Sequence, residues 1–261
     1  MKSVEFLGSS GVGKTYMYHK LFNAYTQSKY LNVRQACIRA AINLEITFGF
    51  NRQTLYNILF GSKVFEKKKY GLSKMILMNH HNNWKEVVNC KISWELFNNY
   101  LASEKRNEVV AKRTANFDRC VCLHGALKST LNESHVVVYD EGALHHHHGL
   151  KSNITANYSL NEIKQDDILN PDAVVFFDLP FEDHMSRVLE RKAKGINTFS
   201  HGPLSNKALE AYVANDVIAY KEKINALKML NVPVLHVNAG ENEQDNLEKI
   251  NVFLDNLTYY A

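Results

Sequence analysis

The chain has 261 residues, 45% of them hydrophobic and 22% charged, which is typical of a globular protein that can bury one sizeable core. It has no run of eighteen apolar residues and no signal-peptide pattern, so we expect a cytoplasmic protein without a membrane partner. The net charge of +4 comes from lysines and arginines scattered between acidic residues, without a basic stripe interleaved with aromatics, so nucleic acid is not expected as a partner.

Short β-rich segments alternate with helical ones along the chain. Four segments are expected to form strands, each with a helix behind it: 4–7, 135–139, 173–177 and 232–237. The helix after the first strand is expected over about 14–25, the closing helix over about 243–257, and a further short strand near 31–34. This alternation predicts an α/β fold in which helices cover a mainly parallel sheet.

The stretch between about residues 40 and 131 has helical periodicity and few breakers. Candidate helices lie around 52–60, 84–102 and 106–130. So long a helical stretch between two strands exceeds a simple crossover. We therefore expect an inserted helical subdomain that holds an acceptor substrate.

A phosphate-binding pattern lies between the first strand and its helix. The pattern is G-x-x-x-x-G-K-[ST], and its residues are Gly8, Ser9, Ser10, Gly11, Val12, Gly13, Lys14 and Thr15. The glycines let backbone N–H groups surround a phosphate at the positive end of the helix. Lys14 is expected to contact the β- and γ-phosphates of ATP, and Thr15 to offer its hydroxyl to Mg²⁺. The alternative is a glycine-rich turn with an incidental lysine, which the strand before it and the helix after it disfavour.

Two carboxylates, Asp140 and Glu141, follow the three valines of the strand at 135–139. Ligands of open α/β sheets gather at the carboxyl edge of the strands. Asp140 is therefore predicted to hold Mg²⁺, in part through water, and Glu141 to polarise a nucleophile or to serve the metal as well. The alternative is a strand that only ends in a polar turn at Gly142.

Two arginines, Arg187 and Arg191, lie four residues apart in the predicted helix after residue 180 and so share one face of it. Two guanidinium groups on one face can clamp phosphates while charge shifts during transfer. The alternative is a solvated helix in which Glu182 and Glu190 are their partners.

Four adjacent histidines, at positions 145–148, follow the acidic pair. They fit either a metal site or a polar segment over the active site, and one of them could reach a substrate. Arg113 and Arg119 could supply further cationic contacts or lie on the surface. Trp84 and Trp94 could stack on a base or a sugar, or belong to the core.

In this order, these pieces resemble the P-loop small-molecule kinases of the thymidylate kinase and deoxynucleoside kinase type. In that family a strand ending in Asp-Arg or Glu-Arg follows a helical region, and a later strand ending in Asp-x-Pro leads into a lid helix with arginines. Here Asp140 takes the acidic position, Asp178-Leu179-Pro180 matches the end of the later strand, and Arg187 and Arg191 match the lid arginines.

The resemblance implies a three-layer P-loop NTPase fold that forms one kinase-like domain over residues 1–261. It also implies helical substrate and lid elements around 40–131 and 181–207, a final strand near the adenine, and ATP and Mg²⁺ as cofactors. Because kinases of this type are often dimers, it implies a homodimer as well.

One departure from the family concerns the acceptor. The arginine of the family's Asp-Arg pair, which touches a substrate phosphate, is replaced by Glu141, and Gly142 follows. An acidic pair suits a neutral acceptor, because Glu141 could take a proton from a hydroxyl without an anionic phosphate beside it.

The sequence thus favours an ATP-dependent phosphotransferase that moves the γ-phosphoryl group to a hydroxyl of a small molecule, such as a nucleoside, nucleotide, sugar or polyol. The alternative is an NTPase or nucleotide-dependent switch in which Asp140 and Glu141 act as a Walker B pair and Glu141 activates water.

Overall fold

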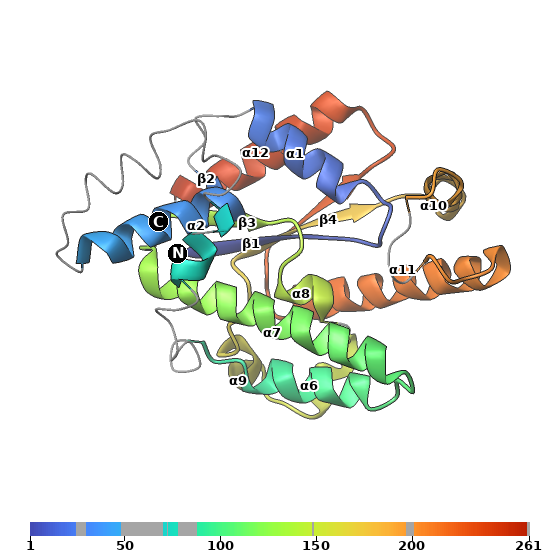
Figure 1. Ribbon diagram of the computed structural model, residues 1–261, viewed down its shortest axis with the longest axis horizontal. Helices are drawn as coiled ribbons and strands as arrows, with labels where there is room; N and C mark the ends of the chain where they lie inside the picture. Colours follow the sequence, from blue (N-terminus) through green and yellow to red (C-terminus); the bar gives the residue numbers. More distant parts are fainter. Residues whose placement is uncertain are drawn as a thin grey trace.

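The computed structural model describes residues 1–24, 30–47, 70–71, 73–77, 88–147, 149–196 and 201–259. Within these residues five strands form one parallel sheet in the order β2-β3-β1-β4-β5 (Figure 1). The strands are β1 (Lys2–Leu7), β2 (Tyr30–Asn32), β3 (Val136–Tyr139), β4 (Ala173–Asp178) and β5 (Val234–Asn238). Since β1 is the central strand, the loop that follows it leaves from the middle of the sheet's carboxyl edge.

Helices cover both faces of this sheet. Figure 1 shows α1 and α12 on one side and α7, α8 and α11 on the other. The described helices are α1 (Lys14–Ala24), α2 (Val33–Thr47), α6 (Lys91–Leu101), α7 (Asn107–Thr130), α8 (Ala143–His146), the 3-10 helix η2 (Ser152–Ala156), α9 (Leu160–Lys164), α10 (Phe181–Ala193), α11 (Asn206–Met229) and α12 (Glu243–Tyr259). The three-layer α/β fold predicted from the sequence is confirmed.

Side chains along β1 alternate between the two faces of the sheet, so each helical layer packs against different residues of this strand. Val4 and Phe6 point into the core shared with α1 and α12, whereas Leu7 belongs to the core shared with α8 and α11. Because successive side chains of a strand point to opposite faces, Glu5 also lies on the side of α8 and α11. β1 therefore places a carboxylate inside an otherwise apolar layer.

The predicted elements agree with the observed ones apart from their ends. β2 ends at Asn32, where α2 begins at Val33, and β5 begins at Val234, after Pro233, whose nitrogen has no hydrogen to donate to a ladder. α6 begins at Lys91, so the helix predicted from residue 84 starts later than expected among the described residues. The helix predicted at 52–60 lies outside the described residues.

The helices between β2 and β3 enclose a small aromatic core that contains His147. This imidazole is fully buried, its Nε2 lies 2.9 Å from the carbonyl oxygen of Ser93, and its ring packs against Phe97 and Phe117. Burial lowers the pKa of His147 to about 4. The ring is therefore neutral in the folded protein at neutral pH.

This burial predicts a loss of stability in acid. The folded pKa of about 4 lies below the ordinary value of 6.5, so the unfolded chain binds the proton first. The contribution of His147 is complete above pH 6.5 and is lost as the pH falls to about 4, by up to about 3 kcal/mol. Urea unfolding across this range should show a smaller acid loss for His147→Gln than for the wild type. His19→Gln, on the exposed face of α1, is the control, and an equal acid loss in all three proteins would contradict the assignment.

Candidate active site

The loop between β1 and α1 has a backbone that only glycine adopts readily. Gly8, Gly11 and Gly13 have φ angles of +143°, +95° and +113°. A Cβ atom at Gly8 would also lie 2.5 Å from the carbonyl oxygen of Phe177 on β4. The loop therefore curls closely over the sheet edge and leads into the first turn of α1, whose N–H groups have no partner within the helix. This is the geometry that holds phosphate groups.

Lys14 lies inside this loop. The residue is 5% exposed, and its Nζ donates to the carbonyl oxygens of Gly8 at 2.7 Å and Ser9 at 3.2 Å. Burial lowers the pKa of Lys14, and the charges of Asp140 and Glu141 oppose this shift. Because both present partners are neutral carbonyls, an anionic phosphate oxygen would be a stronger acceptor for the same ammonium group.

Asp140, at the carboxyl end of β3, and Thr15, in the first turn of α1, lie close enough for the Thr15 side chain to act on the Asp140 carboxyl group. Burial raises the pKa of Asp140, while Thr15 and Lys14 lower it. The Oδ1 atom of Asp140 is buried without a hydrogen-bond partner among the described residues. A buried carboxylate oxygen next to a hydroxyl is a fitting ligand set for Mg²⁺, which prefers oxygen.

Glu141 is the more open of the two carboxylates. Its side chain is 56% exposed, and its Oε1 lies 3.8 Å from Nε2 of His145. Its charge also acts on Lys14. The structure therefore brings Glu141 to the same edge as Lys14, with a carboxylate that a ligand can reach.

α10 packs onto the loop between β1 and α1, and its two arginines have different surroundings. Arg187 donates from Nη1 to the carbonyl oxygen of Val12 and from Nη2 to that of Ala239, both at 3.1 Å. Nη1 of Arg191 would lie 3.6 Å from a Cβ atom at Gly11. Both arginines thus face the loop from one side of α10, but Arg187 bridges two backbone segments, whereas Arg191 borders the loop at Gly11.

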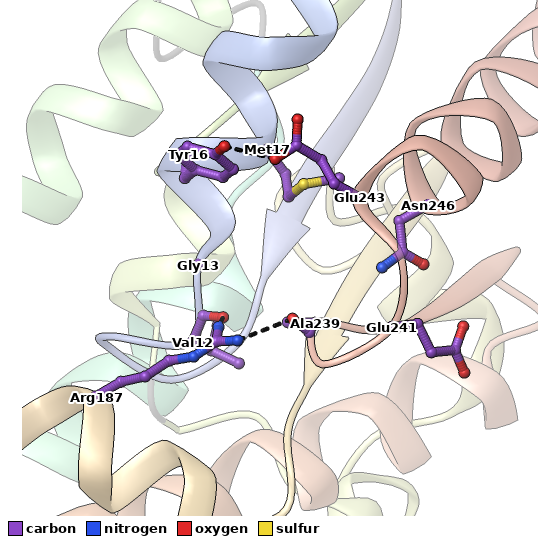
Figure 2. Close-up of a pocket in the computed structure, with 9 residues that line it drawn as sticks. All are labelled: Val12, Gly13, Tyr16, Met17, Arg187, Ala239, Glu241, Glu243 and Asn246. Carbon is purple, nitrogen blue, oxygen red and sulfur yellow. Dashed lines mark hydrogen bonds between the residues drawn. The ribbon is translucent and has the colours of Figure 1, made fainter.

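A cavity of about 280 Å³ opens beside Arg187, between the start of α1 and the loop that joins β5 to α12 (Figure 2). This volume is close to the lower end of the range for small-molecule pockets, about 300 Å³. At its other end Tyr16 donates a hydrogen bond to Glu243. The lining residues are Val12, Gly13, Tyr16, Met17, Arg187, Ala239, Glu241, Glu243 and Asn246. The cavity adjoins the loop between β1 and α1.

The histidines at 145–147 point in different directions because α8 ends at His146. The ring of His145 turns toward Glu141, and that of His147 enters the aromatic core. In the part of the chain that the structure describes, no three His, Cys, Asp or Glu side chains are grouped to hold a metal ion. His148 lies outside the described residues.

The remaining described candidates lie on α6 and α7. Arg113 donates to the hydroxyl of Tyr100, and Arg119 is an exposed side chain of α7. Trp94 packs edge-on against Phe117 and so belongs to the core. Trp84 lies outside the described residues.

Sequence reasoning missed four polar residues that surround the phosphate-binding loop and α8: Glu5 on β1, and Asp216, Tyr220 and Lys223 on α11. Asp216 lies near the backbone N–H of Ser10 in the loop, which lowers the pKa of its carboxyl group. The one available signal was a charged residue inside an apolar pattern, as at Glu5 between Val4 and Phe6. The partners could not be found this way, since they are distant in sequence.

No protein-family model and no curated protein matches this sequence. None of the described helices is long and apolar enough to cross a membrane.

Among solved structures, the chain is similar to deoxyadenosine kinase from M. mycoides. The structure of that enzyme with the products dCMP and dCDP matches with a TM-score of 0.42 and 13% identity, over 98% of this chain and 99% of the other. The structure with bound dATP matches with a TM-score of 0.40 and 12% identity, over 97% and 99%. The motifs and these structural matches thus name the same group of enzymes, the deoxynucleoside kinases.

Proposed function

We propose that this protein is an ATP-dependent phosphotransferase that moves the γ-phosphoryl group to a hydroxyl of a small molecule. The observation that carries the proposal is the convergence of Lys14, the Thr15–Asp140 pair and the exposed carboxylate of Glu141 at one sheet edge. This set combines a phosphate cradle, a cation site and an open base, which are the three elements that phosphoryl transfer needs.

Each residue has a distinct task in this proposal. Lys14 and Arg191 stabilise the charge that spreads over the transferred phosphoryl group, and Glu141 accepts the proton of the acceptor hydroxyl. Thr15 and Asp140 would hold Mg²⁺, which when bound neutralises phosphate charge. Arg187 fixes the cradle relative to the loop after β5, and the adenine of ATP lies in the cavity beside it.

The acceptor is proposed to be neutral near its reacting hydroxyl. Glu141 is the side chain that faces this position from β3, and an anionic phosphate beside it would be repelled. Nucleosides, sugars and polyols therefore suit the site better than nucleotides. The helical elements around 40–131 and 181–207 are proposed to supply the contacts to this acceptor and the lid.

The test is the transfer of label from γ-labelled ATP to a panel of nucleosides, deoxynucleosides, sugars and polyols in the presence of Mg²⁺. Label on a hydroxyl product is expected for the wild type and not for Lys14→Ala. If ATP binds and no member of the panel is labelled, the phosphotransferase proposal is wrong, and steady release of phosphate would favour the NTPase instead.

A further inference from the structure

The side chain of His145 lies between two functional groups from different parts of the chain. Its Nδ1 is 2.9 Å from the hydroxyl of Tyr220 on α11, and its Nε2 is 3.8 Å from Oε1 of Glu141. The three side chains thus form a row that runs from the buried Tyr220 on α11 to the exposed carboxylate at the end of β3.

The backbone around His145 is held by side chains of β1 and α11. The N–H groups of Leu144 and His145 donate to Oε1 and Oε2 of Glu5, at 3.1 and 3.3 Å. Lys223 donates to the carbonyl oxygen of Leu144. A Cβ atom at Gly142 would lie 2.3 Å from the Glu5 carboxyl carbon, so this segment passes directly over the carboxylate. α8 therefore has little freedom to shift.

The ring of His145 is fixed by Tyr220. Tyr220 is 3% exposed, and burial raises its pKa well above the ordinary value, so its hydroxyl keeps its proton. The hydroxyl lies 2.9 Å from Nδ1 but 3.4 Å from the carbonyl oxygen of His145, so Nδ1 is the better acceptor. A proton donated to Nδ1 leaves the imidazole's own hydrogen on Nε2, which faces a carboxylate.

We propose that His145 is a positioning residue for Glu141: Tyr220 holds the imidazole in its Nε2–H form, and this N–H orients the carboxylate toward the acceptor hydroxyl. The distance of 3.8 Å exceeds a hydrogen bond, but the Glu141 side chain is 56% exposed and a rotation of its carboxylate closes the gap. The inference rests on the proposed function, in which Glu141 is the base.

The same helix supports both halves of the site. α11 carries Asp216, which lies near the backbone N–H of Ser10 in the phosphate-binding loop, and Tyr220 one turn later, which contacts His145. The phosphate-binding loop and the proposed base are thus both positioned by the same helix. A reaction that depends on positioning requires such a fixed relation between them. Among the described residues, the ring of His145 also contacts that of His146, and Glu5 accepts from the His145 backbone N–H. The charges next to these partners are Asp216 beside Tyr220, and Arg119 and Lys223 near His146.

The direct test is the tautomer of His145, observed in ¹⁵N–¹H spectra of the imidazole groups of the whole protein. The His145 signals are those that disappear in His145→Gln. We expect hydrogen on Nε2 and none on Nδ1. Hydrogen on Nδ1 would overturn the proposal, whether or not the protein transfers phosphate.

Two amide variants provide the functional test. His145→Gln can place an N–H near the position of Nε2, whereas His145→Asn reaches only the position of Nδ1. We expect kcat to fall about tenfold in His145→Asn with KM for ATP unchanged, and His145→Gln to recover most of it. A purely structural role would affect both variants alike, and equal activities would contradict the proposal.

Coupling to Glu141 is measured by adding His145→Asn to Glu141→Gln. The second substitution should cause no further loss of kcat, because the group that it positions has gone. Independent losses that multiply would overturn the inference. Absence of any phosphoryl transfer by the wild type would instead refute the proposed function, and the tautomer measurement would still decide the position of the proton.

Discussion

Lys14→Ala is expected to lower kcat for phosphoryl transfer by roughly 10²–10³-fold, the usual loss when one preorganised charge-stabilising donor is removed. Lys14 is the cation inside the loop, and the present acceptors of its Nζ are the carbonyl oxygens of Gly8 and Ser9. Transfer of the phosphoryl group increases the demand for positive charge at this point.

The control for this substitution is Lys164→Ala, which removes an exposed lysine at the end of α9. It should leave kcat within about twofold of the wild type, since surface substitutions remote from a site have small effects. Circular dichroism and the thermal midpoint show whether Lys14→Ala is folded. A folded Lys14→Ala protein with near wild-type kcat would show that the loop has no part in phosphoryl transfer.

Lys223→Met is expected to lower the free energy of unfolding by about 3–5 kcal/mol, the usual cost of leaving a buried charge without its partner. Lys223 is 1% exposed, donates to the carbonyl oxygen of Leu144, and lies 4.6 Å from the ring centre of Tyr220. Its charge lowers the pKa of both Glu5 and Asp216. Without it, these two carboxyl groups stay buried with less compensation.

The pH dependence of the free energy of unfolding shows whether Glu5 is the carboxyl group that loses its partner in Lys223→Met. Burial raises the pKa of Glu5 from 4.5 to about 7, so its folded state keeps a proton that the unfolded chain releases. A raised carboxyl pKa contributes stability below pH 4.5 that is lost as the pH rises through about 7. In Lys223→Met this loss toward high pH should be larger than in the wild type, and Glu5→Gln in the same background should remove it.

Lys221→Met is the matched control, because Lys221 is an exposed lysine of the same helix that pairs loosely with Asp178. Its unfolding free energy should stay within about 0.5 kcal/mol of the wild type. Equal stabilities of Lys221→Met and Lys223→Met in urea unfolding would show that the buried lysine has no special part in the fold.

The layers of the fold were predictable because local patterns specify them. Three valines in β3 and the apolar run of β4 are buried on both faces of a parallel sheet, and such strands have continuous apolar sequences. The phosphate-binding loop has positive φ angles at its three glycines, which other residues rarely adopt. Lys14 and Thr15 could therefore be singled out from a short pattern. In the structure Lys14 is buried in the loop and Thr15 lies beside Asp140.

The direction of each histidine could not be predicted, because it depends on a distant carboxylate. Glu5 caps the N–H groups of Leu144 and His145 from a strand about 140 residues away, and α8 ends after His146. These contacts set the rotation of α8 about its axis, and with it the directions of His145 toward Glu141 and of His147 into the core. The spacing of the histidines alone is compatible with several arrangements.

Spacing predicted the face of the α10 arginines but not their partners. Arg187 and Arg191 both face the phosphate-binding loop, since residues four apart in a helix lie on one side. Which of them is bound to carbonyl groups depends on the loop after β5, where Ala239 accepts from Arg187. That contact is set by the packing of β4 and β5 and has no signature in the sequence of α10.

The central claim is that a small-molecule hydroxyl, and not water, receives the γ-phosphoryl group of ATP. The most direct measurement is Mg²⁺-dependent ATP turnover by the purified protein with no acceptor and with a mixed pool of nucleosides, sugars and polyols, with Lys14→Ala as the blank. The account predicts turnover that rises only with the pool, together with a phosphorylated product detected by mass spectrometry. Turnover that is the same without the pool, and that is lost in Glu141→Gln, would contradict it and assign water as the nucleophile.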